Sequence, residues 1–231
     1  SYNLAYSTKD IRDLVSALQV KFGKYLVVDT IFNANVTVRN IRKLKDKISH
    51  AGVNDKVFIS YSGHGLLSKQ FDYYLSTYST DFSNPDQGGL PYEELEDLLN
   101  GTAARKKLLL IDACHSGEVD KEELMVLDSI SRSMELVKGL QPVGYKNENS
   151  LGLQNSFELM QNLFVNVGKT TGATIISAAA GTQFALERND LRNGVFTFSI
   201  LEAMRNHPSI NVNELKKIVS ERVFQLTNGM Q

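Results

Sequence analysis

Hydrophobic residues recur along the chain with two spacings, one typical of helices and one typical of buried strands. Apolar positions repeat every three or four residues from about 9 to 22, which predicts a helix that ends at Gly23. The segment 25–31 (YLVVDTI) is rich in β-branched residues and predicts a strand. Thr37 precedes a second helical stripe that runs to Ile48, and its hydroxyl predicts an N-cap.

Further strand-like runs alternate with helical patterns along the rest of the chain. Helices are expected at 92–99, 195–204 and from 213 onward, with weaker signals at 122–134 and 156–164. The predicted strands are 57–62 (VFISYS), 107–113 (KLLLIDA) and 173–178 (ATIISA). Unbroken hydrophobicity suits parallel strands that are covered on both faces. We therefore expect an α/β fold, a three-layer α/β/α sandwich with a mostly parallel sheet.

The pattern favours a single domain with one long insertion. The 231 residues suit one α/β domain, and no linker or repeat divides the range 1–231. The segment 118–170 has no clear sheet pattern. Connections in compact domains are usually a few residues long, so we expect this segment to be mobile or proteolytically processed.

Composition and charge exclude several classes of protein. The chain has 25 basic and 26 acidic residues and a formal net charge of −1. Nucleic-acid-binding surfaces need an excess of positive charge, so we expect no nucleic-acid partner. Without an apolar run of about 18 residues or a signal peptide, we expect a soluble, cytoplasmic domain that binds no membrane. The single cysteine, Cys114, cannot form an internal disulfide or a cysteine-based zinc site.

Glycine-flanked polar residues follow two of the predicted strands. Gly63-His64-Gly65 follows 57–62, and Cys114 begins a turn after 107–113. In open α/β sheets, ligands bind beyond the carboxyl ends of the strands. A lone cysteine is usually a small buried residue and a lone histidine is usually structural. However, His64 precedes Cys114 by 50 residues, close to the separation of about 50 that characterises caspases.

These residue types match the requirements of a cysteine protease. Such an enzyme needs a thiolate, an imidazole that moves protons, and backbone N–H groups that face the developing oxyanion. We therefore expect Cys114 to be the nucleophile and His64 the general base and acid. The backbone N–H groups of Gly65 and Cys114 are the expected oxyanion donors.

Two motifs resemble the signature sequences of caspase-like peptidases. They are 61–65 (YSGHG) and 112–117 (DACHSG), and the second has the D-x-C-H-S-G form of the metacaspase and bacterial branch. Weaker similarity continues at 171–174, at 194–197 and in a helix from Glu214. The resemblance implies the caspase-hemoglobinase fold and peptide-bond hydrolysis by a Cys–His dyad. It also makes His115, which adjoins the nucleophile, the weaker candidate for the base.

The aspartate two residues before the cysteine bears on the substrate. Residues two apart on a strand share a face, so Asp112 would favour a basic P1 side chain beside Cys114. The resemblance to metacaspases implies that Asp112, Asp10 and Ser62 line a pocket for Arg or Lys. Asp10 has a second interpretation, as a residue that accepts N–H groups in the first turn of a helix. Glu187 is a weaker third pocket acid.

The chain also departs from the family pattern. Relatives carry a strand before the position of Ser1, inside the sheet between 25–31 and 57–62. We therefore expect that the domain lacks its first strand N-terminal to Ser1 and that further domains lie outside these residues. Many metacaspases use calcium, but the aspartates here form no complete ligand set, so no cofactor or metal is predicted. The scattered aspartates are Asp72, Asp81, Asp86 and Asp120.

The sequence thus predicts a cysteine endopeptidase that cleaves polypeptides after Arg or Lys. Regulation by activation or self-processing is expected, because 118–170 resembles the segment that is cut in family members and contains Arg132, Lys138 and Lys146. The alternative is that 118–170 is an ordinary solvated loop. An activating protein partner is a further expectation from bacterial relatives. Two alternatives remain open: a legumain-like enzyme with a non-basic P1 preference, and a catalytically silent pseudoprotease that binds partners.

Overall fold

A five-stranded mixed sheet forms the centre of the molecule. The computed structural model describes residues 4–115, 153–178 and 186–228. The strand order is β3-β2-β1-β4-β5, with β1, β4 and β5 parallel and with β2 and β3 added antiparallel at one edge. The strands are β1 Lys56–Leu67, β2 Tyr73–Leu75, β3 Leu90–Pro91, β4 Lys106–His115 and β5 Thr174–Ser177.

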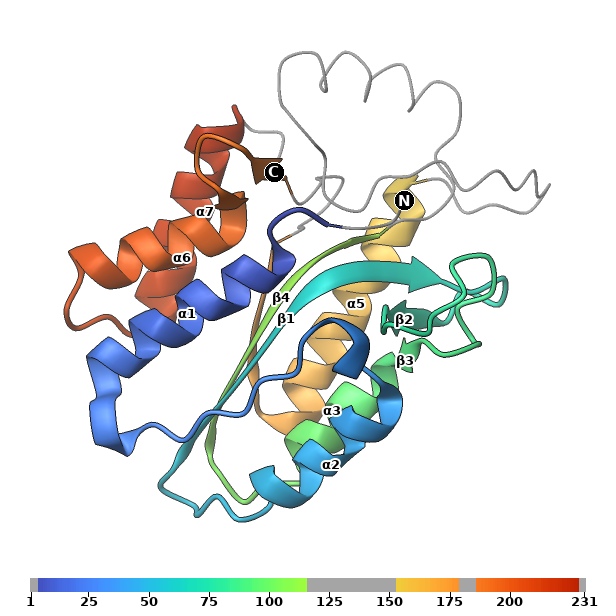
Figure 1. The fold of residues 1–231 in the computed structure, drawn as a ribbon, viewed down its shortest axis with the longest axis horizontal. Helices are drawn as coiled ribbons and strands as arrows, with labels where there is room; N and C mark the ends of the chain where they lie inside the picture. Colours follow the sequence, from blue (N-terminus) through green and yellow to red (C-terminus); the bar gives the residue numbers. More distant parts are fainter. Residues whose placement is uncertain (1–3, 116–152, 179–185, 229–231) are drawn as a thin grey trace.

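Helices cover both faces of this sheet (Figure 1). One layer contains α1 Ser7–Phe22, α6 Val195–Asn206 and α7 Val212–Thr227. The opposite layer contains α2 Val38–Ile48, α3 Tyr92–Asn100 and α5 Leu153–Thr171. A short two-stranded ribbon, β6 Glu187–Arg188 and β7 Asn193–Gly194, precedes α6. This arrangement confirms the three-layer α/β/α fold class with its parallel central strands.

The core is built around β4. Leu109, Leu110, Ile111 and Ala113 are each at most 1% exposed, so consecutive side chains are buried on both faces of the strand. Removal of this apolar surface from water is the main force that stabilises the sheet between its two helical layers. The unbroken hydrophobic run had predicted this central position.

Several predicted helix ends are confirmed in atomic detail. Helix α1 ends at Gly23, which adopts a positive φ of 52°. The Thr37 hydroxyl accepts a hydrogen bond from the Asn40 N–H at 3.2 Å and caps α2. Helix α7 was expected from Asn213 and begins at Val212, where Asn211 and Glu214 form a reciprocal capping box that was not predicted.

The strand predicted at 25–31 is wrong. Gly23–Tyr25 forms a single 3₁₀ turn, and the residues that follow belong to no strand. Val27 is 92% exposed and Tyr25 is 84% exposed, so this segment packs against little. High β-propensity reflects side-chain packing within a sheet, and it does not create a strand where no ladder forms. The strand expected before Ser1 lies outside the described residues and stays a prediction.

The two motif-bearing strands are longer than predicted. We expected the strands to end at Ser62 and Ala113, but β1 continues through His64 to Leu67 and β4 continues through Cys114 to His115. His64, Gly65, Cys114 and His115 therefore lie within the parallel ladder and not in turns that follow it. Strands β2 and β3 were not predicted, since runs of two or three residues show no periodicity.

Part of the predicted insertion folds as a helix. Helix α5 occupies the end of 118–170 and is longer than the expected 156–164. The weaker helix signal at 122–134, like most of the segment, lies outside the described residues. Across 4–115, 153–178 and 186–228, no helix combines the length and apolar character needed to span a bilayer.

Candidate active site

The parallel ladder between β1 and β4 brings the two candidate catalytic residues together. Its register pairs His64 directly with Cys114. Neighbouring strands lie about 4.8 Å apart, so these two backbones are adjacent although 50 residues separate them in sequence. The backbone of Cys114 belongs to β4, whereas its side chain lies outside the described part of the chain.

A second pair of candidate residues lies two positions earlier in the same ladder. Ser62 on β1 is the register partner of Asp112 on β4. Side chains alternate between the faces of a strand with a period of two, so Ser62 and His64 share one face of β1. The ladder therefore assembles four predicted site residues from two segments of sequence.

Hydrogen bonds with Ser76 and Tyr61 hold the backbone of His64. Its N–H donates to the Ser76 Oγ at 3.1 Å, and its carbonyl accepts from the Ser76 N–H at 2.9 Å. The Tyr61 hydroxyl also donates to the His64 carbonyl at 3.0 Å and lies 3.0 Å from the Ser76 carbonyl oxygen. Together these contacts fix the position from which the imidazole projects.

Tyr61 explains why a glycine precedes the histidine. A Cβ atom on Gly63 would lie 2.1 Å from the Tyr61 hydroxyl oxygen and 2.5 Å from the ring carbon that bears it. Contacts shorter than 3.0 Å require something to shift. Because Tyr61 and Gly63 are two residues apart on β1, the tyrosine ring fills the space that a side chain at 63 would need.

The His64 ring is buried against an aromatic residue that the sequence did not single out. His64 is 5% exposed, and its ring meets Phe82 edge-on, with centroids 5.1 Å apart and an interplanar angle of 81°. Phe82 lies in the polar loop between β2 and β3. A lone aromatic residue in a stretch otherwise rich in Asp, Ser and Asn was the available signal.

Asp112 is buried and receives a hydrogen bond from the other end of the chain. It is 2% exposed, and its Oδ2 accepts from the Thr197 hydroxyl at 2.8 Å. Thr197 lies in the first turn of α6 and is itself 5% exposed. In the sequence, 194–197 shows only a family likeness, and no pattern indicates a contact between Thr197 and Asp112.

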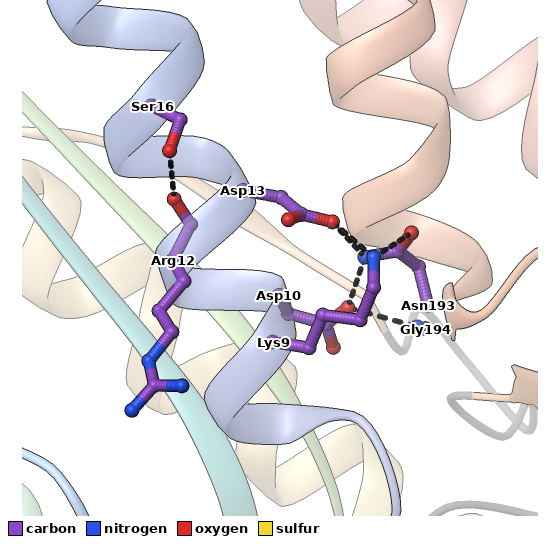
Figure 2. Close-up of polar contacts among 7 residues, drawn as sticks. All are labelled: Lys9, Asp10, Arg12, Asp13, Ser16, Asn193 and Gly194. Carbon is purple, nitrogen blue, oxygen red and sulfur yellow. Dashed lines mark hydrogen bonds and ion pairs between the residues drawn. The ribbon is translucent and has the colours of Figure 1, made fainter.

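Asp10 is completely buried and joins α1 to the start of α6 (Figure 2). Its Oδ1 accepts from the Asn193 side chain at 2.9 Å and from the Gly194 N–H at 3.0 Å. These donors belong to another helix terminus, whereas the structural interpretation of Asp10 had expected N–H groups of its own first turn. Next to it, Asp13 accepts from Asn193 at 3.1 Å and pairs with Lys9.

Comparison with known protein families settles the family. The model of the peptidase C14 family, described as the caspase domain, matches residues 1–231. The chain belongs to the caspase domain family. Its members are cysteine peptidases, so the expected family is confirmed, together with its caspase-like fold.

One solved structure supports the fold of this caspase domain. Protein GSU0716 from Geobacter sulfurreducens is similar over 92% of this chain and 78% of that chain, with a TM-score of 0.60 and 19% sequence identity. At this identity the likeness concerns the fold alone. A comparison with curated proteins finds no match.

The oxyanion and alternative base candidates of this caspase domain occupy the end of the same ladder. Gly65 is buried and is the register partner of His115 on β4 and of Leu75 on β2. The backbone N–H of Gly65, an expected oxyanion donor, therefore lies on β1 directly after His64. The side chain of His115, the weaker base candidate, lies outside the described residues.

Glu187 in this caspase domain has a structural role that its sequence did not reveal. It is 2% exposed, and its two carboxylate oxygens accept from the N–H groups of Ala5 and Tyr6 at 3.2 and 3.1 Å. Tyr6 is the N-cap residue of α1 and its own side chain does not cap the helix. A negative charge at this end of a helix is favourable, so Glu187 caps α1 from a distant part of the chain.

The described ranges contain no group of three or more His, Cys, Asp or Glu side chains that could hold a metal ion. Asp72, Asp81 and Asp86 fall within these ranges, and Asp120 lies outside them.

Proposed function

We propose that this caspase-domain protein is a cysteine endopeptidase that cleaves polypeptides after Arg or Lys through a dyad of His64 and Cys114. One observation carries the proposal: His64 and Cys114 are register partners on adjacent parallel strands. A separation of about 5 Å between neighbouring strands lets an imidazole and a thiol meet at one point on the sheet.

Each member of the dyad has a distinct chemical task. His64 accepts the proton of the Cys114 thiol as the sulfur attacks the carbonyl carbon of the scissile peptide bond. The tetrahedral oxyanion receives hydrogen bonds from the backbone N–H groups of Gly65 and Cys114. His64 then donates its proton to the leaving amine, which leaves a thioester on the sulfur, and a water molecule activated by His64 hydrolyses this thioester.

We assign recognition of the P1 residue to the carboxylates of Asp112 and Asp10. Asp112 precedes Cys114 by two residues on β4 and is the register partner of Ser62. A buried carboxylate attracts a cationic side chain more strongly than an exposed one does, since the effective dielectric constant is lower away from water. Asp112 with Ser62, and Asp10 from α1, would therefore select Arg or Lys over neutral and acidic P1 residues.

A panel of fluorogenic peptides that differ only at P1 tests this function. Arg and Lys peptides should be hydrolysed, Asp peptides should not, and the Cys114→Ala variant should cleave none of them. Preferential cleavage after Asn would instead support the legumain-like alternative. If wild type cleaves every peptide no faster than Cys114→Ala does, the pseudoprotease alternative is supported. Matching thermal unfolding curves for wild type and Cys114→Ala would show that the loss of turnover does not come from a loss of folding.

Self-processing is the proposed means of regulation. Arg132, Lys138 and Lys146 in 118–170 suit the proposed P1 preference. Intact-mass measurement of purified wild type and Cys114→Ala tests this directly. Wild type should contain fragments that end at one of these basic residues and Cys114→Ala should not, whereas identical intact masses would contradict self-processing and leave activation to a protein partner.

A further inference from the structure

Two acids from distant parts of the chain are bound by the same helical turn. Asp10 comes from α1 and Asp112 from β4, yet both accept hydrogen bonds from the segment 193–197. Figure 2 shows the Asp10 half of this arrangement, in which Asn193 and Gly194 approach the carboxylate from the start of α6. Thr197 forms the other half by donating to the Asp112 Oδ2 at 2.8 Å.

All of these groups are buried, which makes the hydrogen bonds important. Asp10 and Asp112 are 0% and 2% exposed, and Asn193 and Thr197 are 4% and 5% exposed. A buried carboxylate that loses a donor cannot replace it with water without rearrangement, so its free energy rises. The three donors are an amide side chain, a backbone N–H and a hydroxyl. Being neutral, they orient the carboxylates without adding a positive charge of their own.

The geometry of the helix links the two contacts. Gly194 is the N-cap residue of α6, and Thr197 follows it by three positions. Residues three apart lie on the same side of a helix, about 5–6 Å from each other. The first turn also carries the positive end of the helix dipole, which favours nearby negative charge. The segment 193–197 thereby donates hydrogen bonds to both carboxylates.

We infer that the first turn of α6 is the positioning element of the P1 pocket, and that Thr197 determines P1 specificity by orienting Asp112. This inference rests on the proposed function, since it assigns the two acids to recognition of a P1 cation. Thr197 acts through Asp112 and is a positioning residue. Its hydroxyl restrains one oxygen of the Asp112 carboxylate before substrate arrives, which lowers the cost of ordering when the guanidinium or ammonium group binds.

Substitution at position 197 separates this role from simple packing. Thr197→Val keeps the branched shape and removes the hydroxyl, and Thr197→Ser keeps the hydroxyl and removes a methyl group. Ser199→Ala is a matched control, because Ser199 is a buried hydroxyl on the same helix that donates to the Val195 carbonyl. Substrates with Arg or citrulline at P1 have nearly the same shape, but only Arg carries a charge.

Thr197→Val should raise KM for the Arg substrate by about 10- to 100-fold, the range for loss of a hydrogen bond to a charged group. The kcat for that substrate and the kcat/KM for the citrulline substrate should change by less than about threefold, an effect smaller than one neutral hydrogen bond. Thr197→Ser should restore the wild-type KM, and Ser199→Ala should resemble wild type. An unchanged Arg-to-citrulline ratio in Thr197→Val would overturn the inference, and so would equal losses in the Val and Ser variants. If Thr197→Val does not fold, the same comparison is made between Thr197→Ser and Thr197→Ala.

A binding measurement separates failure of this inference from failure of the proposed function. Calorimetry on Cys114→Ala, with and without Thr197→Val, measures affinity for the Arg and citrulline peptides without turnover. If wild type cleaves neither Arg nor Lys substrates, the proposed function is wrong. If Cys114→Ala binds the Arg peptide more tightly than the citrulline peptide, and Thr197→Val abolishes that difference, the positioning role is still supported. Equal binding of both peptides in Cys114→Ala would overturn that role as well.

Discussion

His64 on β1 and Cys114 on β4 are direct register partners in the central parallel ladder. Any chemistry shared by these residues therefore depends on the pairing of two strands whose sequences lie 50 residues apart. A slip of one residue would move each side chain to the other face of the sheet. Burial of β4 on both faces opposes such a slip, so the hydrophobic core maintains the geometry that the proposed function requires.

Gly63→Ala should impair both stability and turnover. The added methyl group would overlap the Tyr61 hydroxyl, which hydrogen-bonds the His64 carbonyl, so the tyrosine ring or the strand must shift to relieve the contact. We expect a loss of about 1–3 kcal/mol in the free energy of unfolding, the usual cost of overpacking. The kcat/KM for an Arg substrate should fall as His64 moves.

Chemical denaturation and steady-state kinetics measure both effects. Gly52→Ala is the matched control, because a Cβ at Gly52 would make only an ordinary 3.4 Å contact with Asp55. Wild-type stability and activity in Gly63→Ala would show that Tyr61 does not constrain this position.

Glu187→Ala should destabilise the protein without changing its P1 preference. The substitution removes the carboxylate that accepts the N–H groups of Ala5 and Tyr6 at the start of α1. Loss of a helix cap costs about 0.5–2 kcal/mol, which denaturant titration would detect. The ratio of kcat/KM for Arg and Asp substrates should equal that of wild type. A marked change in this ratio, with unfolding free energy unaltered, would instead place Glu187 in the pocket.

Asp13 should contribute to stability at neutral pH and lose that contribution in acid. Burial raises the pKa of the Asp13 carboxyl, but hydrogen bonds from Lys9 and Asn193 and the charge of Lys9 outweigh it, so the pKa lies below its ordinary value. A pKa that is lower in the folded state stabilises the protein above the unfolded pKa, and the effect disappears as pH falls through the folded pKa.

Thermal unfolding of wild type and Asp13→Asn across pH tests this sign. Wild type should be more stable by about 0.3–0.5 kcal/mol at pH 6, the scale of a partly solvated i,i+4 pair. The difference should shrink below about pH 4, near the unfolded pKa of aspartate. A difference that grows with acidification would contradict the assignment.

Local patterns in the sequence predicted the parts of the fold that local physics determines. The unbroken apolar run of β4 and the caps at Gly23 and Thr37 are such features, and the structure confirms them. The prediction of a strand at 25–31 was wrong, because residues with high β-propensity form a strand only where a neighbouring strand pairs with them. Strand ends were misjudged at both motifs, because the ladder between β1 and β4 extends each strand and neither sequence alone encodes that pairing.

The contacts that surround the candidate site depend on the tertiary fold. Asp10 and Asn193 are 183 residues apart in the chain and their hydrogen bond follows no periodicity. The same holds for Thr197 and Asp112, which lie 85 residues apart. Phe82 meets the His64 ring only through the fold of the loop between β2 and β3. The sequence motifs indicated which residues matter, whereas the sheet and the start of α6 determine how those residues are held.

A double-mutant cycle of His64 and Cys114 tests the central claim most directly. Steady-state kinetics with an Arg substrate would be measured for wild type, His64→Ala, Cys114→Ala and the double variant. Each single substitution should lower kcat by at least about 10²-fold, and the double variant should lose no more than the worse single one, because residues that act as a unit are not additive. Losses that multiply in the double variant, or a His64→Ala enzyme with wild-type kcat, would contradict the dyad.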